Sequence, residues 1–170
     1  MGIEKLNQYV NPTNTIKYFI DIGSGRGKLP CWYAGIPLII KSIGIEIVLQ
    51  RHLDGLDLVD KLSKKFPNIT EKIELRSGSI EQYNLRELVA TSSDTLVWIC
   101  NLCFGEKLTN KVFIQILNQL SKGTIICCSK KPTLNIDSDT INKLELDEQI
   151  QHIQMSWWNN LSDVFVCKIV

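Results

Sequence analysis

No apolar run in this chain of 170 residues reaches the roughly 20 residues that a membrane-spanning helix requires. The stretch IPLIIKSIGIEIVL is interrupted by Lys41 and Glu46. The first residues, MGIEKLNQYVNPTN, lack the apolar core of a signal peptide, so an oxidising compartment is not indicated for the six cysteines. We therefore expect a soluble, intracellular protein without membrane contact, and the sequence does not distinguish cytoplasm from nucleus.

An excess of positive charge is also missing. The 19 lysines and arginines are balanced by 18 acidic residues, which leaves a formal net charge of +1. Proteins that bind nucleic acid through its phosphates usually carry a basic stripe, so nucleic acid is not indicated as a partner. Internal repeats, low-complexity tracts and linkers are absent too. We predict a polar N-terminal arm over residues 1–15 and a single domain over residues 16–170.

The apolar residues alternate between short continuous runs and helix-spaced runs. Continuous runs predict strands buried on both faces, whereas apolar residues at three- and four-residue steps predict amphipathic helices. The predicted strands are Ile16–Ile22, Ser42–Ile47, Ile73–Arg76, Thr95–Asn101 and Thr124–Ser129. The predicted helices are Leu29–Ala34, Val48–Phe66, Asn84–Ala90 and Glu106–Leu120.

This alternation predicts the fold class. Strands joined by helices require right-handed crossovers, which place helices on both faces of a parallel sheet. The end of the chain differs, because a short polar connection joins Lys143–Trp157 to Asp163–Val170 and favours an antiparallel hairpin. We therefore predict an α/β, doubly wound, mostly parallel sheet with an antiparallel C-terminal hairpin.

The first predicted strand runs into the glycine-rich turn D-I-G-S-G-R-G at residues 21–27. In an open parallel sheet, ligands bind beyond the carboxyl ends of the strands. Glycines permit positive φ and let a ligand approach the backbone, and the start of the following helix offers free amides. The turn predicts a ligand site; the alternative is a glycine-rich turn without a ligand.

A carboxylate at the end of the second strand narrows the choice of ligand. Glu46 follows the glycine turn by about 20 residues, a spacing that suits contact with the two hydroxyls of a ribose. NAD and S-adenosyl-L-methionine (AdoMet) both carry that ribose. The spacing G-x-G-x-G differs from that of pyrophosphate sites, and Asp21 repels a pyrophosphate but accepts the ammonium of a methionine moiety. We predict AdoMet, with S-adenosyl-L-homocysteine as product; the alternative for Glu46 is an exposed acid at a strand end.

Lys28, directly after the turn, does not complete a phosphate loop. The pattern G-x-x-x-x-G-K-[ST] fails because Ile22 occupies the first glycine position and Leu29 the hydroxyl position. Two roles stay open for Lys28: contact with the carboxylate of AdoMet, or a solvated lysine at a helix start.

Further motifs point to one family. The turn at residues 21–27 and G-I-E at residues 44–46 are followed by N-L-C-F-G at residues 101–105, C-S-K at residues 128–130 and S-W at residues 156–157. In these motifs the chain resembles the non-SET histone lysine methyltransferases named for disruption of telomeric silencing (Dot type). The resemblance covers the chain from Ile16 to its C-terminus. It implies a seven-stranded, Rossmann-like methyltransferase sheet.

The resemblance also implies roles for single residues. Asn101 is implied at the active site, near the sulfonium and the channel of the target lysine, and Phe104 is implied as a wall of that channel. Ser79 stands where the family has an aspartate facing the adenine amine. Asn101 and Phe104 are thus the candidate catalytic residues. The candidate cofactor-binding residues are Asp21, Gly23, Ser24, Gly25, Gly27, Lys28, Glu46, Ile47, Ser79 and Asn101.

The function predicted from these motifs is methyl transfer from AdoMet to an amine, with a histone-like protein lysine favoured. One alternative is methylation of RNA or a small molecule. The other is a non-catalytic methyltransferase-like module that works with a partner subunit, suggested by Ser79 and by Phe165, where the family has a tyrosine. Cys100 and Cys103 have C-x-x-C spacing but no second pair, so we expect buried apolar thiols and no metal site.

Overall fold

A computed structural model describes residues 2–90, 93–133, 142–147, 151–154 and 161–170. The S-W motif at residues 156–157 lies outside these residues. One twisted sheet forms the centre of the molecule, with the strand order β3-β2-β1-β4-β5-β8-β6 and with β7 paired to β8. The strands are β1 Tyr18–Ile22, β2 Lys41–Glu46, β3 Ile73–Ser77, β4 Thr95–Ile99, β5 Ile125–Cys128, β6 Leu144–Leu146, β7 Gln151–Gln154 and β8 Leu161–Ile169.

The first five strands run parallel, and the C-terminal strands run antiparallel to their partners. This confirms the predicted doubly wound sheet and its antiparallel ending. The described residues contain eight strands rather than seven, because the single strand predicted over Lys143–Trp157 contains both β6 and β7. β8 has nine residues and pairs with β7 through its first four and with β6 through its last three.

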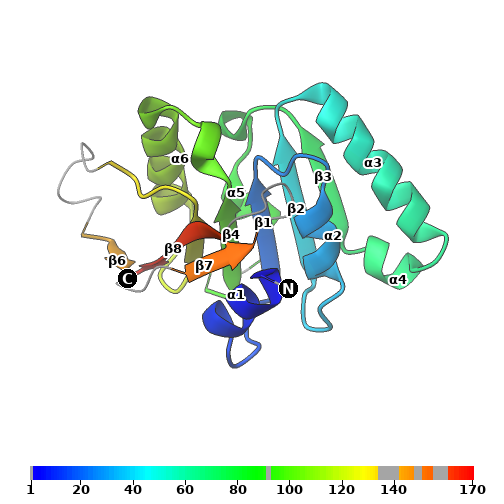
Figure 1. Cartoon of the computed structure of the whole chain (residues 1–170), viewed down its shortest axis with the longest axis horizontal. Helices are drawn as coiled ribbons and strands as arrows, with labels where there is room; N and C mark the ends of the chain where they lie inside the picture. Colours follow the sequence, from blue (N-terminus) through cyan, green and yellow to red (C-terminus); the bar gives the residue numbers. More distant parts are fainter. Residues whose placement is uncertain (1, 91–92, 134–141, 148–150, 155–160) are drawn as a thin grey trace.

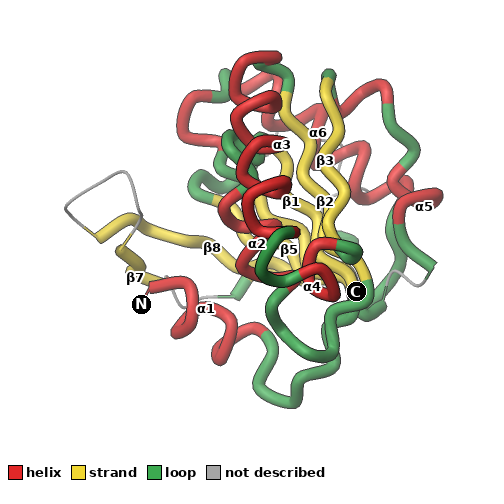
Figure 2. The backbone as a smooth tube through the Cα atoms, turned by 90° about the vertical axis from the view of Figure 1, so that its right-hand side faces the viewer, coloured by secondary structure: helices red, strands yellow, loops and turns green. Residues whose placement is uncertain are grey.

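Helices cover both faces of the sheet (Figures 1 and 2). One face carries α1 Gly2–Val10, α2 Lys28–Ala34, α3 Leu49–Ser63 and α4 Pro67–Thr70; the other carries the 3-10 turn η1 Ile80–Gln82, α5 Leu85–Leu88 and α6 Glu106–Gln119. A second 3-10 turn, η2 Asn101–Cys103, follows β4. None of the helices in the described ranges is long and apolar enough to cross a bilayer.

The N-terminal segment, which was predicted as a polar arm, contains a helix. Helix α1 lies beside β7 in Figures 1 and 2, and Leu6 and Val10 are buried in the same core cluster as Ile153 of β7. The helix was not predicted, although its apolar residues recur at helical spacing; the strand that buries them comes from the far end of the chain. After the helix, the side-chain oxygen of Asn11 accepts hydrogen bonds from the backbone amides of residues 15 and 16. The boundary at residue 15 stays a prediction.

Helix α3 confirms the longest predicted helix but not its amphipathic face. Leu49, Leu53 and Leu56 are 60%, 47% and 44% exposed, and Gly55 is the buried residue of the helix. A Cβ added at Gly55 would lie 3.0 Å from the side chain of Leu75 in β3. The helix therefore approaches the sheet at its smallest residue, which turns the leucine stripe away from the core.

Candidate AdoMet site

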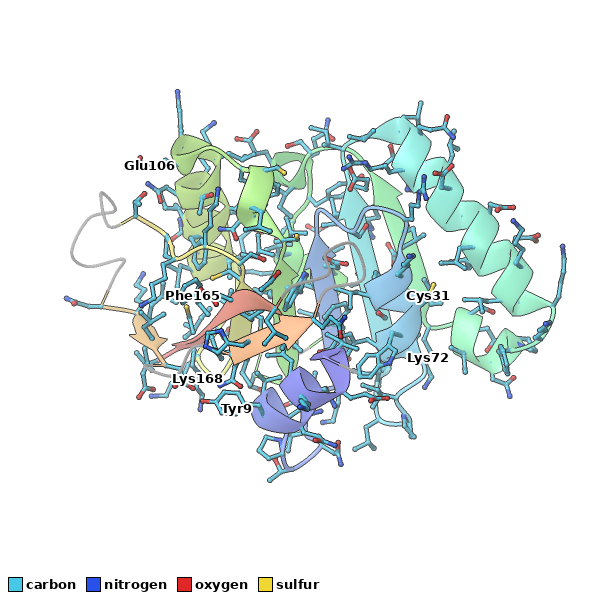
Figure 3. The ribbon with its side chains drawn as sticks, in the orientation of Figure 1. Tyr9, Cys31, Lys72, Glu106, Phe165 and Lys168 are labelled. Atoms are coloured by element: carbon cyan, nitrogen blue, oxygen red, sulfur yellow. The ribbon has the colours of Figure 1, made fainter. Side chains whose placement is uncertain are left out.

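The glycine turn lies at the carboxyl edge of the sheet. In Figure 3, Glu106, which follows β4 at the start of α6, lies near the top of the molecule, and Lys72, just ahead of β3, lies lower. The carboxyl ends of the parallel strands therefore point toward the top of this view. Three glycines of the turn, Gly23, Gly25 and Gly27, have φ values of 82°, 56° and 71°, a region that residues with a side chain rarely adopt. The backbone amides of Gly23 and Ser24 donate to the carbonyl of Ile45 in β2 at 2.9 and 3.0 Å. The turn is thus held against the second strand.

Asp21, the first residue of the motif at residues 21–27, is buried within the sheet. Its side chain is 2% exposed, and its Oδ1 atom has no hydrogen-bond partner among the described residues. Burial raises the pKa of this carboxyl well above its ordinary value, and the nearby charge of Glu46 raises it further. A buried carboxylate at the ligand-binding edge of the sheet is a fitting contact for a cationic group such as an ammonium.

Glu46 joins the end of β2 to the glycine turn. One carboxylate oxygen accepts from the backbone amide of Gly25 at 2.7 Å, and the other accepts from the amide of Val48 at 2.8 Å. Each carboxylate oxygen has further acceptor capacity, so both remain able to accept from hydroxyl groups. Glu46 is buried, whereas the neighbouring Ile47 is 69% exposed at the rim.

Asn101 ties the end of β4 to the end of β5. Its Oδ1 accepts from the backbone amides of Ser129 and Lys130 at 3.0 and 2.8 Å, and its Nδ2 donates to the carbonyl of Lys130 at 2.8 Å. The side chain is completely buried. This residue therefore fixes two adjacent strand ends, and its predicted catalytic role stays a prediction.

Phe104 brings the segment after β4 over the glycine turn. A Cβ added at Gly23 would lie 3.5 Å from Cζ of the Phe104 ring. The ring is partly buried against the core cluster that contains Ile22 and Ile99. This position agrees with a wall beside the turn.

Ser79 lies in the loop after β3. The amide of the preceding residue, Gly78, donates to the carbonyl of Glu46 at 2.9 Å, which places the loop beside the end of β2. The hydroxyl of Ser79 accepts from the amide of Glu81 and so caps η1. Lys28 is the exposed first residue of α2. The structure therefore brings Asp21, the turn, Glu46, Asn101 and Phe104 to one edge, with Ile47 and Lys28 exposed.

Two further regions bear on the sequence predictions. Cys100 is half-buried, but Cys103 is exposed at the end of η2, so the expectation of a buried thiol is wrong for Cys103. A groove of about 500 Å³ follows η1, α5 and the end of α6. None of the predicted site residues lines it; its lining consists of Glu81, Gln82, Tyr83, Asn84, Arg86, Asn118 and Gln119.

Comparison with known protein families shows which family the chain belongs to. The family model described as "Histone methylation protein DOT1" matches residues 3–165. The chain belongs to the DOT1 family. A relative from Caenorhabditis elegans, named "Histone-lysine N-methyltransferase, H3 lysine-79 specific", is 27% identical over 137 residues. The match covers 79% of this chain but 14% of the relative, so the chain spans only a small part of that protein's length.

Solved structures share the fold of this DOT1-family chain at low sequence identity. An RNA methyltransferase from Salinibacter ruber, in complex with S-adenosyl-L-homocysteine, has a TM-score of 0.63 and 14% identity, covering 98% of this chain and 90% of the other. The methyltransferase domain of bacterial CtHen1 has a TM-score of 0.67 and 11% identity, covering 99% and 98%. The Rossmann-like methyltransferase fold and the family resemblance predicted from the motifs are confirmed.

Some residues of the site in this DOT1-family chain were not assigned a role from the sequence. Ser129 and Lys130 belong to a motif that supported the resemblance, but their contacts with Asn101 depend on β4 and β5 being neighbours. Tyr33 and Trp98 are buried aromatic residues whose polar atoms have no partner among the described residues. A hydroxyl or indole N–H in an otherwise apolar run is the only sequence signal for them.

We expect the close packing under the turn to depend on Gly44. A Cβ added there would lie 2.8 Å from both Leu75 and the hydroxyl oxygen of Ser24, so Gly44→Ala should lower the free energy of unfolding by about 1–3 kcal/mol in urea denaturation. Gly105→Ala is the matched control, because no atom lies within 4 Å of the added group; its loss should stay below about 1 kcal/mol. Equal losses in the two variants contradict this account.

Proposed function

We propose that this chain is an AdoMet-dependent methyltransferase that transfers a methyl group to a lysine amine of a histone-like protein. The observation that carries the proposal is the buried carboxylate of Asp21, with its Oδ1 unpartnered, beside Glu46 and the glycine turn at one edge of the sheet. This is the edge at which doubly wound proteins bind their ligands.

The residues present fit AdoMet. Asp21 would accept hydrogen bonds from the ammonium of the methionine part, and Glu46 would accept them from the ribose hydroxyls through the lone pairs that the amides of Gly25 and Val48 leave free. Ser79 would contact the adenine end, because its loop is joined to Glu46 through Gly78. When bound, AdoMet supplies a methyl group on a sulfonium centre.

The protein's own part in the reaction is mainly positioning. Transfer of a methyl group in line requires a neutral amine held close to the methyl carbon in a site that excludes water. Asn101 acts as a positioning residue here, since both of its polar atoms bond to the backbone after β5. Phe104 covers the turn near Gly23 and excludes water from that side.

A protein lysine is favoured over nucleic acid as the acceptor. The curated relative is named as specific for lysine 79 of histone H3, and this chain belongs to the same family. Its formal net charge of +1 offers little attraction to a polyphosphate. A histone acceptor also favours the nucleus over the cytoplasm as the place of action.

Two measurements on the full chain test the proposal. Isothermal titration with S-adenosyl-L-homocysteine should show binding, and methyl-labelled AdoMet should label histones or nucleosomes but not RNA. Lack of binding at millimolar ligand overturns the proposed cofactor. Labelling of RNA alone overturns the protein substrate, and binding without transfer to any acceptor in a cell extract favours a non-catalytic module over an enzyme.

A further inference from the structure

Three buried polar atoms without partners among the described residues lie on the same face of the sheet, below the glycine turn. They are Oδ1 of Asp21, the hydroxyl of Tyr33 and Nε1 of Trp98. Each of the three side chains is at most 2% exposed. Buried polar groups in folded proteins are almost always hydrogen-bonded, so three such atoms in one region call for a common partner.

The sheet register places Asp21 and Trp98 side by side. They are partners in the parallel pairing of β1 with β4, so their side chains project from the same face of the sheet. Cys127 continues this row on β5, in register with Trp98.

Tyr33 covers the same row from helix α2. Its ring stacks on that of Phe19 with 3.7 Å between centroids, and Phe19 lies two residues before Asp21 on the same face of β1. The pKa of Tyr33 is raised by burial first, then by Cys127, and then by the charge of Asp21. Tyr33 therefore packs on the face of the sheet from which Asp21 and Trp98 project.

The chemistry of the three atoms is complementary. An indole N–H only donates, a carboxylate oxygen only accepts, and a tyrosine hydroxyl does both. A buried water that makes about three hydrogen bonds is a common way to satisfy such a set.

We propose that Tyr33 and Trp98 are positioning residues that hold, with one buried water, the Oδ1 side of the Asp21 carboxylate and so prepare it to accept the ammonium of an amino-acid ligand. The inference rests on the proposed function for the identity of that ligand. It adds a specific consequence. Tyr33 and Trp98 strengthen the binding of ligands that carry the ammonium, such as S-adenosyl-L-homocysteine, but not of 5′-methylthioadenosine, which lacks the amino-acid part.

Tyr33→Phe tests this proposal with little change in shape, because it removes one hydroxyl and keeps the ring on Phe19. We expect its affinity for S-adenosyl-L-homocysteine to fall by about fivefold to tenfold, and its affinity for 5′-methylthioadenosine to stay within about twofold. Tyr18→Phe is the matched control: Tyr18 lies on β1 but in the core cluster of the opposite face, and its removal should change neither affinity. Equal losses for both ligands, or no loss for the first, overturn the proposal.

A second measurement needs no ligand and therefore separates this inference from the proposed function. The Asp21 carboxyl is followed by carbon-13 NMR titration of the free protein, in which Glu46, Tyr33 and Cys100 are the titratable groups whose charges interact with it. Loss of a donor to the ionised carboxylate should raise the pKa of Asp21 in Tyr33→Phe but not in Tyr18→Phe. An unchanged pKa overturns the inference even if AdoMet binds, and a raised pKa supports it even if AdoMet does not.

Discussion

Asp21→Asn is expected to weaken binding of S-adenosyl-L-homocysteine by roughly 100-fold and to raise the melting temperature of the free protein at neutral pH. Binding falls because an amide cannot offer the ammonium a charged acceptor. Stability rises because ionising a buried carboxyl beside Glu46 is costly, and that cost disappears in the variant. Opposite changes in affinity and stability at one residue identify a side chain kept for function.

The pH dependence of this variant follows from the direction of the pKa shift. Burial, and then Glu46, raises the pKa of Asp21 in the folded protein above that in the unfolded chain. Between these two values the folded state holds the extra proton, so the wild-type loses stability as the pH rises through this window. The advantage of Asp21→Asn should therefore vanish at acidic pH, below both pKa values, and reach its full size above the folded-state value.

Differential scanning fluorimetry over this pH range measures the melting temperatures, and titration calorimetry measures the affinities. Asp57→Asn is the matched control, because Asp57 is an exposed carboxylate paired with Lys61 on α3. Its change should have little effect on either quantity. Retention of wild-type affinity in Asp21→Asn removes this carboxylate from the binding site.

Asn101→Ala is expected to lower the free energy of unfolding by about 3 kcal/mol, a fall of roughly 6–12 °C in melting temperature. The amide and carbonyl of Lys130 both lose their bonds to the Asn101 side chain. The amide of Ser129 keeps only a longer contact, of 3.3 Å, with the carbonyl of Ile99. The backbone directly after β5 then loses its side-chain ties to the end of β4.

A positioning role for Asn101 also predicts a separate effect on methyl transfer and on cofactor affinity. At a temperature at which Asn101→Ala is folded, methyl transfer should fall while affinity for S-adenosyl-L-homocysteine changes little, because the proposed cofactor contacts come from the ends of β1 and β2 and from the loop after β3. Asn101→Asp keeps an acceptor for the two amides but loses the donor to Lys130, so its stability should be intermediate. Asn68→Ala, at an exposed site in α4, serves as the control. Undiminished transfer by Asn101→Ala excludes this residue from the active site.

Much of the sheet was predictable because strands that are buried on both faces have continuous apolar runs in the sequence. The run ending at Ile22 is fully buried in β1, and the run ending at Ile99 is fully buried in β4. Glu46 and Asn101 were then expected at one edge, since parallel strands end on the same side of a sheet. The three positive φ values of the turn likewise follow from its glycines.

The unpredicted helix α1 and the wrongly predicted buried face of α3 have a shared cause. Helix α1 packs on β7, whose residues lie about 140 positions later in the chain, so its own segment does not reveal the strand that buries it. The leucine stripe of α3 has the period of a buried face, yet the helix packs through Gly55. In both cases a contact distant in sequence decided which side chains were covered.

By itself, the sequence determined the alternation of strands and helices, the family, and the residues that meet at the carboxyl edge, because these follow from local pattern and from the direction of parallel strands. Only the tertiary structure decided how those residues are used. The unpartnered oxygen of Asp21, the three bonds of Asn101 and the cluster with Tyr33 and Trp98 all depend on which strands are neighbours and in what register. Hydrogen bonding requires positions accurate to a fraction of an ångström, and the packing of distant segments sets those positions.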